Sequence, residues 1–190
     1  MVVSKFSSVE LQNVLSKSKK IFTNHQIDSA LAIVADRLNA DLVDADPIFL
    51  CVLNGALMVY GQLMQKITIP ARMDTIYATR YGDASVGSSL EWKSYPSSDL
   101  SGQVVVLVDD VLEGGVTLAA MVDYCQQAGA TKVLTVVLIN KKIPRVAGGL
   151  MDPDYAAFEM GDGFLIGYGL DYKGYLRNTK DVYILDGNAS

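Results

Sequence analysis

Two adjacent carboxylates, Asp109 and Asp110, directly follow the apolar run 104–108. A run of valine and leucine of this kind predicts a strand buried on both faces of a parallel sheet. A glycine pair and Thr117 follow, and a helical pattern begins at Leu118. The N–H groups of such a loop and the dipole of the following helix favour a phosphate, whereas paired acids favour magnesium or ribose hydroxyls. The segment therefore predicts a site for a phosphorylated sugar.

Other strand–loop–helix sites fit this segment less well. The Gly-Lys-Thr or Gly-Lys-Ser of a P-loop is absent, and so is the glycine spacing of the Rossmann fingerprint. A receiver-type phosphorylation site also uses acids at strand ends, but its first acids belong after an early strand, and nothing comparable follows Leu53. One alternative stays open, in which Asp109 and Asp110 are solvated residues that only close a strand.

The elements that must position these residues alternate along the chain. We expect helices at 9–22, 27–42, 56–65 and 118–127, and strands at 47–53, 71–81, 90–95, 104–109, 132–140, 155–159, 164–167 and 182–185. This alternation predicts an α/β fold with an open, mainly parallel, twisted sheet and helices on both faces. Ligands of such sheets bind outside the carboxyl ends of the strands, where the acid pair lies.

Length, composition and net charge limit the classes of protein to which the chain can belong. The chain has 190 residues, which fits one domain, and 50% of them are hydrophobic, which suits a sheet covered by helices. A net charge of −5 argues against nucleic acid as a partner. Cys51 and Cys125 lie in apolar patterns, which predicts buried reduced thiols. Without a signal-peptide pattern or a membrane-spanning run, we expect a cytoplasmic protein with no membrane partner.

Five segments together resemble a known family. Residues 107–118 resemble the phosphoribosyl-pyrophosphate (PRPP) motif of the type I phosphoribosyltransferases. Four more segments match by their order and spacing: 53–56, 141–145, 164–172 and 175–177. They narrow the resemblance to the hypoxanthine-guanine phosphoribosyltransferases, and it covers about residues 48–186. The resemblance implies that family's fold over a single domain, 1–190. Its core would cover about 45–145, and a small hood would combine the N-terminal segment with about 146–190.

The resemblance also implies a role for each matching residue. Asp109 and Asp110 would bind the ribose hydroxyls, directly or through magnesium. Glu113 stands where the family usually has the aspartate near purine N7, the proposed general acid/base. The 5-phosphate would be held by the loop residues, which are Glu113, Gly114, Gly115, Val116 and Thr117.

Further roles concern the base and the pyrophosphate. Lys141 would donate to the purine 6-oxo group, Phe164 would stack on the base, Leu165 would contact it through its backbone, and Asp171 would help to hold magnesium. The pyrophosphate would contact Leu53, Asn54, Gly55, Arg80, Tyr81 and Arg177. Simpler alternatives stay open: Lys141 as a surface lysine, Phe164 as a core residue, and Asp171 with Arg177 as a surface ion pair.

Four positions depart from the family pattern. Asn54 replaces a frequent lysine, Arg80 replaces the serine of a Ser-Tyr pair, Glu113 replaces an aspartate, and Val116 replaces a common lysine. The small, polar segment 82–89 predicts a mobile loop. In the reaction that the resemblance implies, this loop would close over the site.

The implied activity is purine salvage. The phosphoribosyl group of PRPP would pass to N9 of hypoxanthine or guanine, giving IMP or GMP and pyrophosphate. Mg²⁺ would be the cofactor, and PRPP and a 6-oxopurine base the partners, in a homodimer or homotetramer. Three alternatives stay open: transfer to xanthine or another base, a non-catalytic PRPP-binding regulator, and a structural domain whose acid pair is accidental.

Overall fold

A six-stranded sheet forms the core of the protein, for which a computed structural model describes residues 6–80 and 90–185. The strand order is β4-β3-β2-β5-β6-β7. β4 is antiparallel to its neighbour, and the other five strands run parallel. The strands are β2 (Ile48–Val52), β3 (Arg72–Arg80), β4 (Leu90–Ser94), β5 (Val104–Leu112), β6 (Lys132–Lys141) and β7 (Tyr155–Met160). This is the mainly parallel sheet that the sequence predicts.

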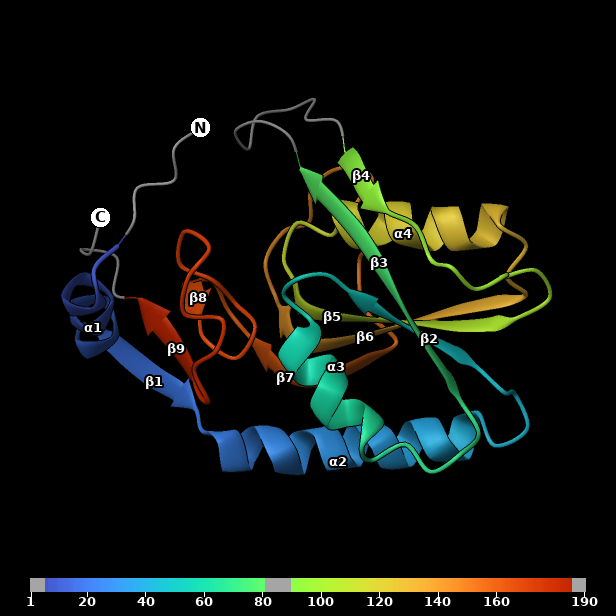
Figure 1. Ribbon diagram of the computed structural model, residues 1–190, viewed down its shortest axis with the longest axis horizontal. Coiled ribbons are helices and arrows are strands. Elements are labelled where there is room, and N and C mark those ends of the chain that lie inside the picture. Colours follow the sequence, from blue (N-terminus) through green and yellow to red (C-terminus); the bar gives the residue numbers. More distant parts are fainter. Residues whose placement is uncertain (1–5, 81–89, 186–190) are drawn as a thin grey trace.

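Helices cover both faces of this sheet (Figure 1). α4 (Val116–Gln127) packs on β5 and β6, and on the opposite face α3 (Leu57–Met64) packs on β2 and β5. α2 (Asn24–Asp41) lies beside α3 and contacts β7. α2 begins at a capping box formed by Thr23 and Gln26, and its apolar stripe is fully inside the core. The predicted fold class is thereby confirmed.

Burial of the central strands fixes where the acid pair lies. All five residues of β2 are buried, and 105–108 of β5 have no exposed surface. Removing a valine or leucine side chain from water stabilises the fold by about 1.5–3 kcal/mol. β5 therefore cannot shift along its neighbours, and its register places Asp109 opposite Val137 of β6. The strand continues to Leu112, so the acids lie within β5 and not, as expected, at its last residue.

A smaller antiparallel sheet, the hood, contains β1 (Ser18–Phe22), β9 (Val182–Leu185) and β8 (Phe164–Ile166), in the order β1-β9-β8. Figure 1 shows it beside the carboxyl ends of the core strands, with α1 (Ser8–Ser16) next to β1.

The single helix expected over 9–22 is wrong, because α1 ends at Ser16 and the next residues form β1. β1 pairs with β9, from the other end of the chain, and Phe22 stacks on Phe158 with ring centroids 3.9 Å apart. These non-local contacts outweigh the local helical spacing. A second difference concerns the hood boundary, since β7 lies in the core sheet although it follows residue 146. None of the helices in the described residues is long and apolar enough to cross a membrane.

Candidate active site

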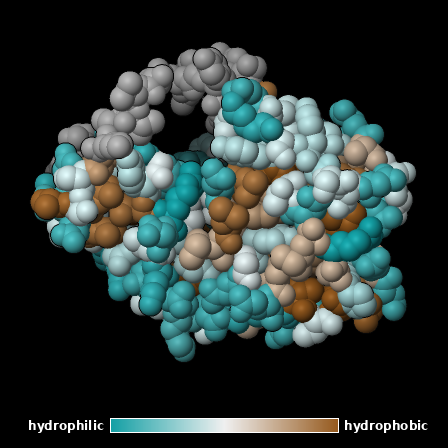
Figure 2. Space-filling view, in the orientation of Figure 1, coloured by the Kyte–Doolittle hydropathy of each residue, from teal (hydrophilic) through white to brown (hydrophobic). Residues whose placement is uncertain are grey.

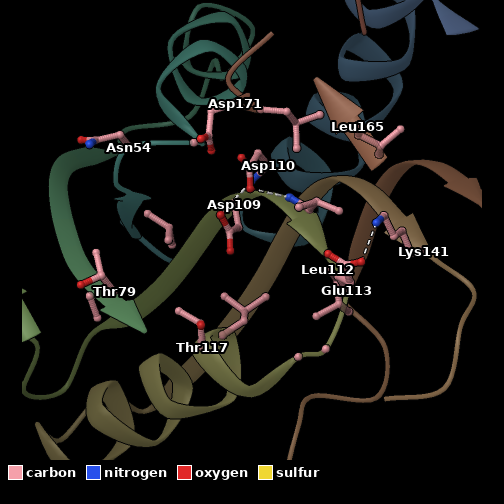
Figure 3. A pocket seen from close by; sticks show the side chains of 18 of the residues that line it. Asn54, Thr79, Asp109, Asp110, Leu112, Glu113, Thr117, Lys141, Leu165 and Asp171 are labelled. Atoms are coloured by element: carbon pink, nitrogen blue, oxygen red, sulfur yellow. Dashed lines mark hydrogen bonds and ion pairs between the residues drawn. The ribbon is translucent and has the colours of Figure 1, made fainter. Parts of the chain in front are cut away.

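A cavity of about 850 Å³ opens between the hood and the carboxyl ends of the core strands. Figure 2 shows the surface hollowed between these two parts, with hydrophilic and hydrophobic groups on the rim. Figure 3 shows three regions inside it: the acids Asp109, Asp110 and Asp171, the start of α4 at Thr117, and the pair Glu113 and Lys141. Among the residues assigned from the sequence, the lining includes Leu53, Asn54, Gly55, Asp109, Asp110, Glu113, Gly114, Gly115, Thr117, Lys141, Phe164, Leu165, Asp171 and Arg177.

The two adjacent acids are removed from solvent. Asp109 is only 9% exposed, and Asp110 is partly buried. The Asp110 N–H donates to Asp109 Oδ1 at 2.9 Å, and the Val111 N–H donates to Asp110 Oδ1 at 2.8 Å. Burial raises the pKa of Asp109 well above its usual range, and the neighbouring charge of Asp110 raises it further. Burial also raises the pKa of Asp110, although the Arg177 charge opposes this. The acids are therefore not solvated strand ends.

The loop after β2 lies against these acids. Its Leu53–Asn54 peptide is cis, and the Ala56 N–H donates to the Val52 carbonyl at 3.1 Å. Gly169 of the hood approaches so closely that a Cβ there would lie 2.0 Å from the Gly55 carbonyl oxygen. The loop is thus held between the hood and β5.

The glycine-rich segment leads into α4. Gly115 has φ 79° and occupies the N-cap position, and a Cβ there would lie 2.5 Å from the Leu150 carbonyl oxygen. Within the described residues, no side chain caps this end of the helix. The first N–H groups of an α-helix have no partner within the helix, so they can meet an anion. Thr117 lines the cavity at this point, whereas Val116 is not among the described residues that line it.

Arg145 holds the same segment from outside the cavity. Its Nη1 donates to the Glu113 carbonyl at 2.6 Å and to the Leu112 carbonyl at 3.1 Å. Its Nε donates to the Met151 carbonyl at 2.9 Å, and its Nη2 donates to Oδ1 of the buried Asn140. Sequence reasoning assigned Arg145 no role. The available signal was its place four residues after Lys141.

Residues of β6 and β8 line another part of the cavity. Lys141 is the last residue of β6, and its side chain is 5% exposed. Its Nζ lies 2.7 Å from Glu113 Oε1, in an ion pair drawn as a dashed line in Figure 3. Phe164 begins β8, is 55% exposed, and meets Tyr172 edge-on at a centroid distance of 6.5 Å. Lys141 is thus no surface lysine, and Phe164 is no core residue.

Asp171 and Arg177 enter the cavity from the hood. Arg177 Nη2 lies 2.7 Å from Asp171 Oδ1, so the ion pair of the simpler alternative forms, and both residues also line the cavity. Arg177 Nη1 donates to the Gly169 carbonyl at 2.6 Å. In the described part of the chain, no group of three or more His, Cys, Asp or Glu residues is arranged to hold a metal ion by itself.

The Arg80 side chain, Tyr81 and the expected mobile loop 82–89 lie outside the described residues. The lining also has members that sequence reasoning did not assign, among them Tyr77 and Thr79 from β3. Thr79 lies at one of the strand ends where ligands of such sheets bind, which was the available signal.

Comparison with known proteins gives consistent results. The family model of the phosphoribosyl transferase domain matches residues 18–173. The hypoxanthine-guanine phosphoribosyltransferase of Bacillus subtilis is 28% identical over 169 residues, which cover 88% of this chain and 92% of that protein. The human hypoxanthine-guanine phosphoribosyltransferase is 30% identical over 146 residues, 72% of this chain and 66% of the human protein.

Solved structures agree on the fold. A hypoxanthine phosphoribosyltransferase from Staphylococcus aureus superimposes with a TM-score of 0.85 at 22% identity, over 96% of this chain and 97% of that one. A mutant of the Trypanosoma cruzi hypoxanthine phosphoribosyltransferase, complexed with the product IMP, gives a TM-score of 0.81 at 25% identity, over 89% and 91% of the two chains. With the matched domain covering most of its length, the chain belongs to the phosphoribosyltransferase family.

Proposed function

We propose that this cavity transfers the phosphoribosyl group of PRPP to N9 of a 6-oxopurine, hypoxanthine or guanine, releasing pyrophosphate. The chain is accordingly an enzyme of purine salvage, as the activity of its named relatives indicates. One observation carries the proposal. A buried acid pair, an uncapped helix start and a buried lysine beside an exposed phenylalanine line a single cavity in the described part of the chain.

The sugar phosphate would occupy the α4 end of the cavity. The 5-phosphate would accept hydrogen bonds from the N–H groups at the start of α4 and from the Thr117 hydroxyl. Asp109 and Asp110 would accept from the ribose hydroxyls. Their raised pKa values mean that burial disfavours the charged carboxylates, and hydroxyl donors would offset this cost.

The base would lie between Phe164 and the end of β6. Phe164 would stack on the purine, and Leu165 would contact it through backbone groups. A lysine donates but cannot accept a hydrogen bond, so Lys141 matches a 6-oxo group and faces the amino group of adenine donor to donor. A buried donor left without an acceptor makes discrimination against the wrong base strong.

The residues would act mainly by position and charge. Bond breaking gives carbon 1 of the ribose an oxocarbenium-like character, and a fixed base and phosphate align N9 with that carbon. The Glu113 carboxylate would take up or release the proton at purine N7 as the base becomes a nucleophile. Arg177 would contact the pyrophosphate as it leaves, with Asn54 and Gly55 offering neutral donors.

The residues present fit a magnesium ion. Mg²⁺ is usually bound by one or two carboxylates together with substrate oxygens, so Asp109, Asp110 and Asp171 suffice without forming a complete protein cage. When bound, the ion neutralises charge on the pyrophosphate. We also propose that the enzyme works as a homodimer or homotetramer, on the resemblance alone.

A direct assay tests this function. Protein, PRPP and Mg²⁺ are incubated with hypoxanthine, guanine, xanthine or adenine in turn, and nucleotide formation is followed. We expect IMP and GMP to form, no AMP, and full loss of turnover in excess chelator that is restored by Mg²⁺. PRPP binding without turnover with any base would support a regulator instead. Full activity in chelator would contradict the magnesium site.

A further inference from the structure

The ion pair between Glu113 and Lys141 lies in the part of the cavity where the proposed purine edge would bind. Lys141 Nζ and Glu113 Oε1 are 2.7 Å apart, and the lysine side chain is 5% exposed. An ammonium group this far from water needs an anionic or polar partner. Among the described side chains, Glu113 is the one that Lys141 meets by hydrogen bond or ion pair. The lysine that should read the 6-oxo group is therefore already engaged.

The Glu113 side chain can move away from the ion pair, whereas the Lys141 side chain cannot. The Glu113 side chain is 53% exposed, so it can rotate into solvent or along the cavity. Its backbone is fixed, because Arg145 donates to the Glu113 carbonyl at 2.6 Å. Lys141 is held at the end of β6, where 134–140 are all buried. Any exchange at this pair must therefore move the Glu113 carboxylate and not the lysine.

The pair matches one purine state and opposes another. On a free 6-oxopurine with a proton at N7, the O6 acceptor and the N7–H donor are neighbours on one edge. Lys141 and Glu113, one hydrogen bond apart, can serve O6 and N7–H respectively. In a nucleotide the purine carries ribose at N9, and N7 has only a lone pair. A carboxylate that faces this lone pair forms no hydrogen bond with it, and the carboxylate still attracts the Lys141 ammonium group.

We infer that Glu113 is a specificity-determining residue. It competes with the 6-oxo group of the nucleotide for Lys141, whereas it can accept from N7–H of a free base, so Glu113 weakens binding of the nucleotide product relative to the base. The inference rests on the proposed function. It differs from proton transfer at N7, because it concerns the equilibrium affinity for IMP and acts through Lys141. Product release would be faster as a consequence, since the carboxylate recovers its partner when IMP leaves.

Titration calorimetry with IMP tests the inference on the intact protein. Replacing Glu113→Ala removes the competitor without adding a donor to N7. We expect IMP to bind about fivefold more tightly, the equivalent of a modest ion pair. In a Lys141→Met background the same Glu113→Ala change should alter IMP affinity little, because there is no lysine to compete for. Glu159→Ala breaks an exposed ion pair with Lys142 and serves as the control, with unchanged IMP affinity expected.

The results of these titrations distinguish the inference from a direct effect of Glu113 on IMP and from a failure of the proposed function. Unchanged or weaker IMP binding by Glu113→Ala overturns the inference, and thermal unfolding shows whether that variant is folded. Equal tightening in the Lys141→Met background also overturns it, because the carboxylate would then act on IMP directly. Failure of the unchanged protein to bind IMP at all would instead contradict the proposed function.

Discussion

Gly55 and Asp110 lie so close that a Cβ at position 55 would stand 1.9 Å from Asp110 Oδ2 and 2.5 Å from its Cγ. Gly55 lies in the loop after β2, and Asp110 lies within β5. The proposed pyrophosphate loop and the proposed ribose-binding acids are therefore fitted directly to one another. The loop after β2 has no room to move away from Asp110, because the Gly55 carbonyl packs against the backbone of Gly169.

The first prediction follows from this contact. Gly55→Ala should push the Asp110 carboxylate out of place and break its 2.8 Å bond to the Val111 N–H. Because misplacement of a positioning group by about 1 Å can cost about 10²-fold, we expect a loss of that order in kcat/KM for PRPP. Steady-state kinetics at varied PRPP measures it. Gly61→Ala is the matched control, since a Cβ there meets no atom of the described residues within 4 Å. Kinetics indistinguishable between the two variants would contradict the assignment.

The second prediction concerns Arg145. Arg145→Met removes donors to the Leu112, Glu113 and Met151 carbonyls and leaves Oδ1 of the buried Asn140 without its arginine. An unsatisfied buried acceptor costs about 1–3 kcal/mol, so the free energy of unfolding should fall by about that amount. The KM for PRPP should rise more than the KM for hypoxanthine, because the proposed phosphate-binding loop loses the hydrogen bonds from Arg145 that hold it. Lys142→Met, an exposed neighbour with ion pairs to Asp152 and Glu159, is the control and should change little. Equal rises of both KM values would indicate a purely structural arginine.

The sequence predicted those parts of the molecule that depend on local pattern. The buried run of β5, the glycine turn into α4 and the strand expected at 132–140 follow from apolar periodicity and from the glycine and proline positions. The structure has all three, although β5 continues to Leu112 and β6 to Lys141. Lys141 and Phe164 were placed from the family resemblance, and they line one cavity with Asp109. Parallel strand direction explains this result for Asp109 and Lys141, since the carboxyl ends of parallel strands gather at one edge. Phe164 instead comes from β8 of the hood.

Features that depend on distant pairing were not predicted. β1 is a strand only because β9, more than a hundred residues later, pairs with it. The role of Arg145 required knowing that 112–113 and Met151 lie on either side of it. These contacts depend on tertiary packing, and the spacing of Arg145 from Lys141 does not by itself predict them. The resemblance assigns Val116 to the phosphate through its backbone. Val116 is not among the described residues that line the cavity, and its role stays a prediction.

The third prediction concerns the proposed hydrogen bond from Lys141 to the purine 6-oxo group. Lys141→Ala should weaken use of hypoxanthine and guanine by about 1–3 kcal/mol, the worth of a charge-assisted hydrogen bond. PRPP binding should change little, because the proposed 5-phosphate site is at the start of α4. Initial rates at varied base and at varied PRPP separate the two effects. Collapse of PRPP binding with unchanged base preference would make Lys141 a phosphate or structural residue.

The fourth prediction uses the raised pKa of Asp109. Burial raises this pKa above its usual 3.8, so between 3.8 and the folded value the folded chain binds more protons than the unfolded chain. The free energy of unfolding of the ligand-free protein should therefore fall as pH rises through that window, and stay lower above it. Asp109→Asn removes the penalty and should raise the melting temperature near neutral pH while it lowers activity. Asp162→Asn, at an exposed turn, should leave the melting temperature nearly unchanged. A lower melting temperature for Asp109→Asn near neutral pH would contradict the argument.

The fifth prediction concerns the carboxylate at position 113. Glu113→Gln should lower kcat by about 10²–10⁴-fold, the usual contribution of general acid–base catalysis. Glu113→Asp should keep most activity, because it restores the residue common in the family. The alternative is an acid that only complements the start of α4, which is worth about 0.3–1 kcal/mol of stability. Kinetics and thermal unfolding distinguish the two, with the exposed Glu159→Gln as the charge control. A Gln variant that unfolds slightly earlier but turns over normally would support the alternative, and Asp110, which lines the same cavity, would become the candidate acid/base.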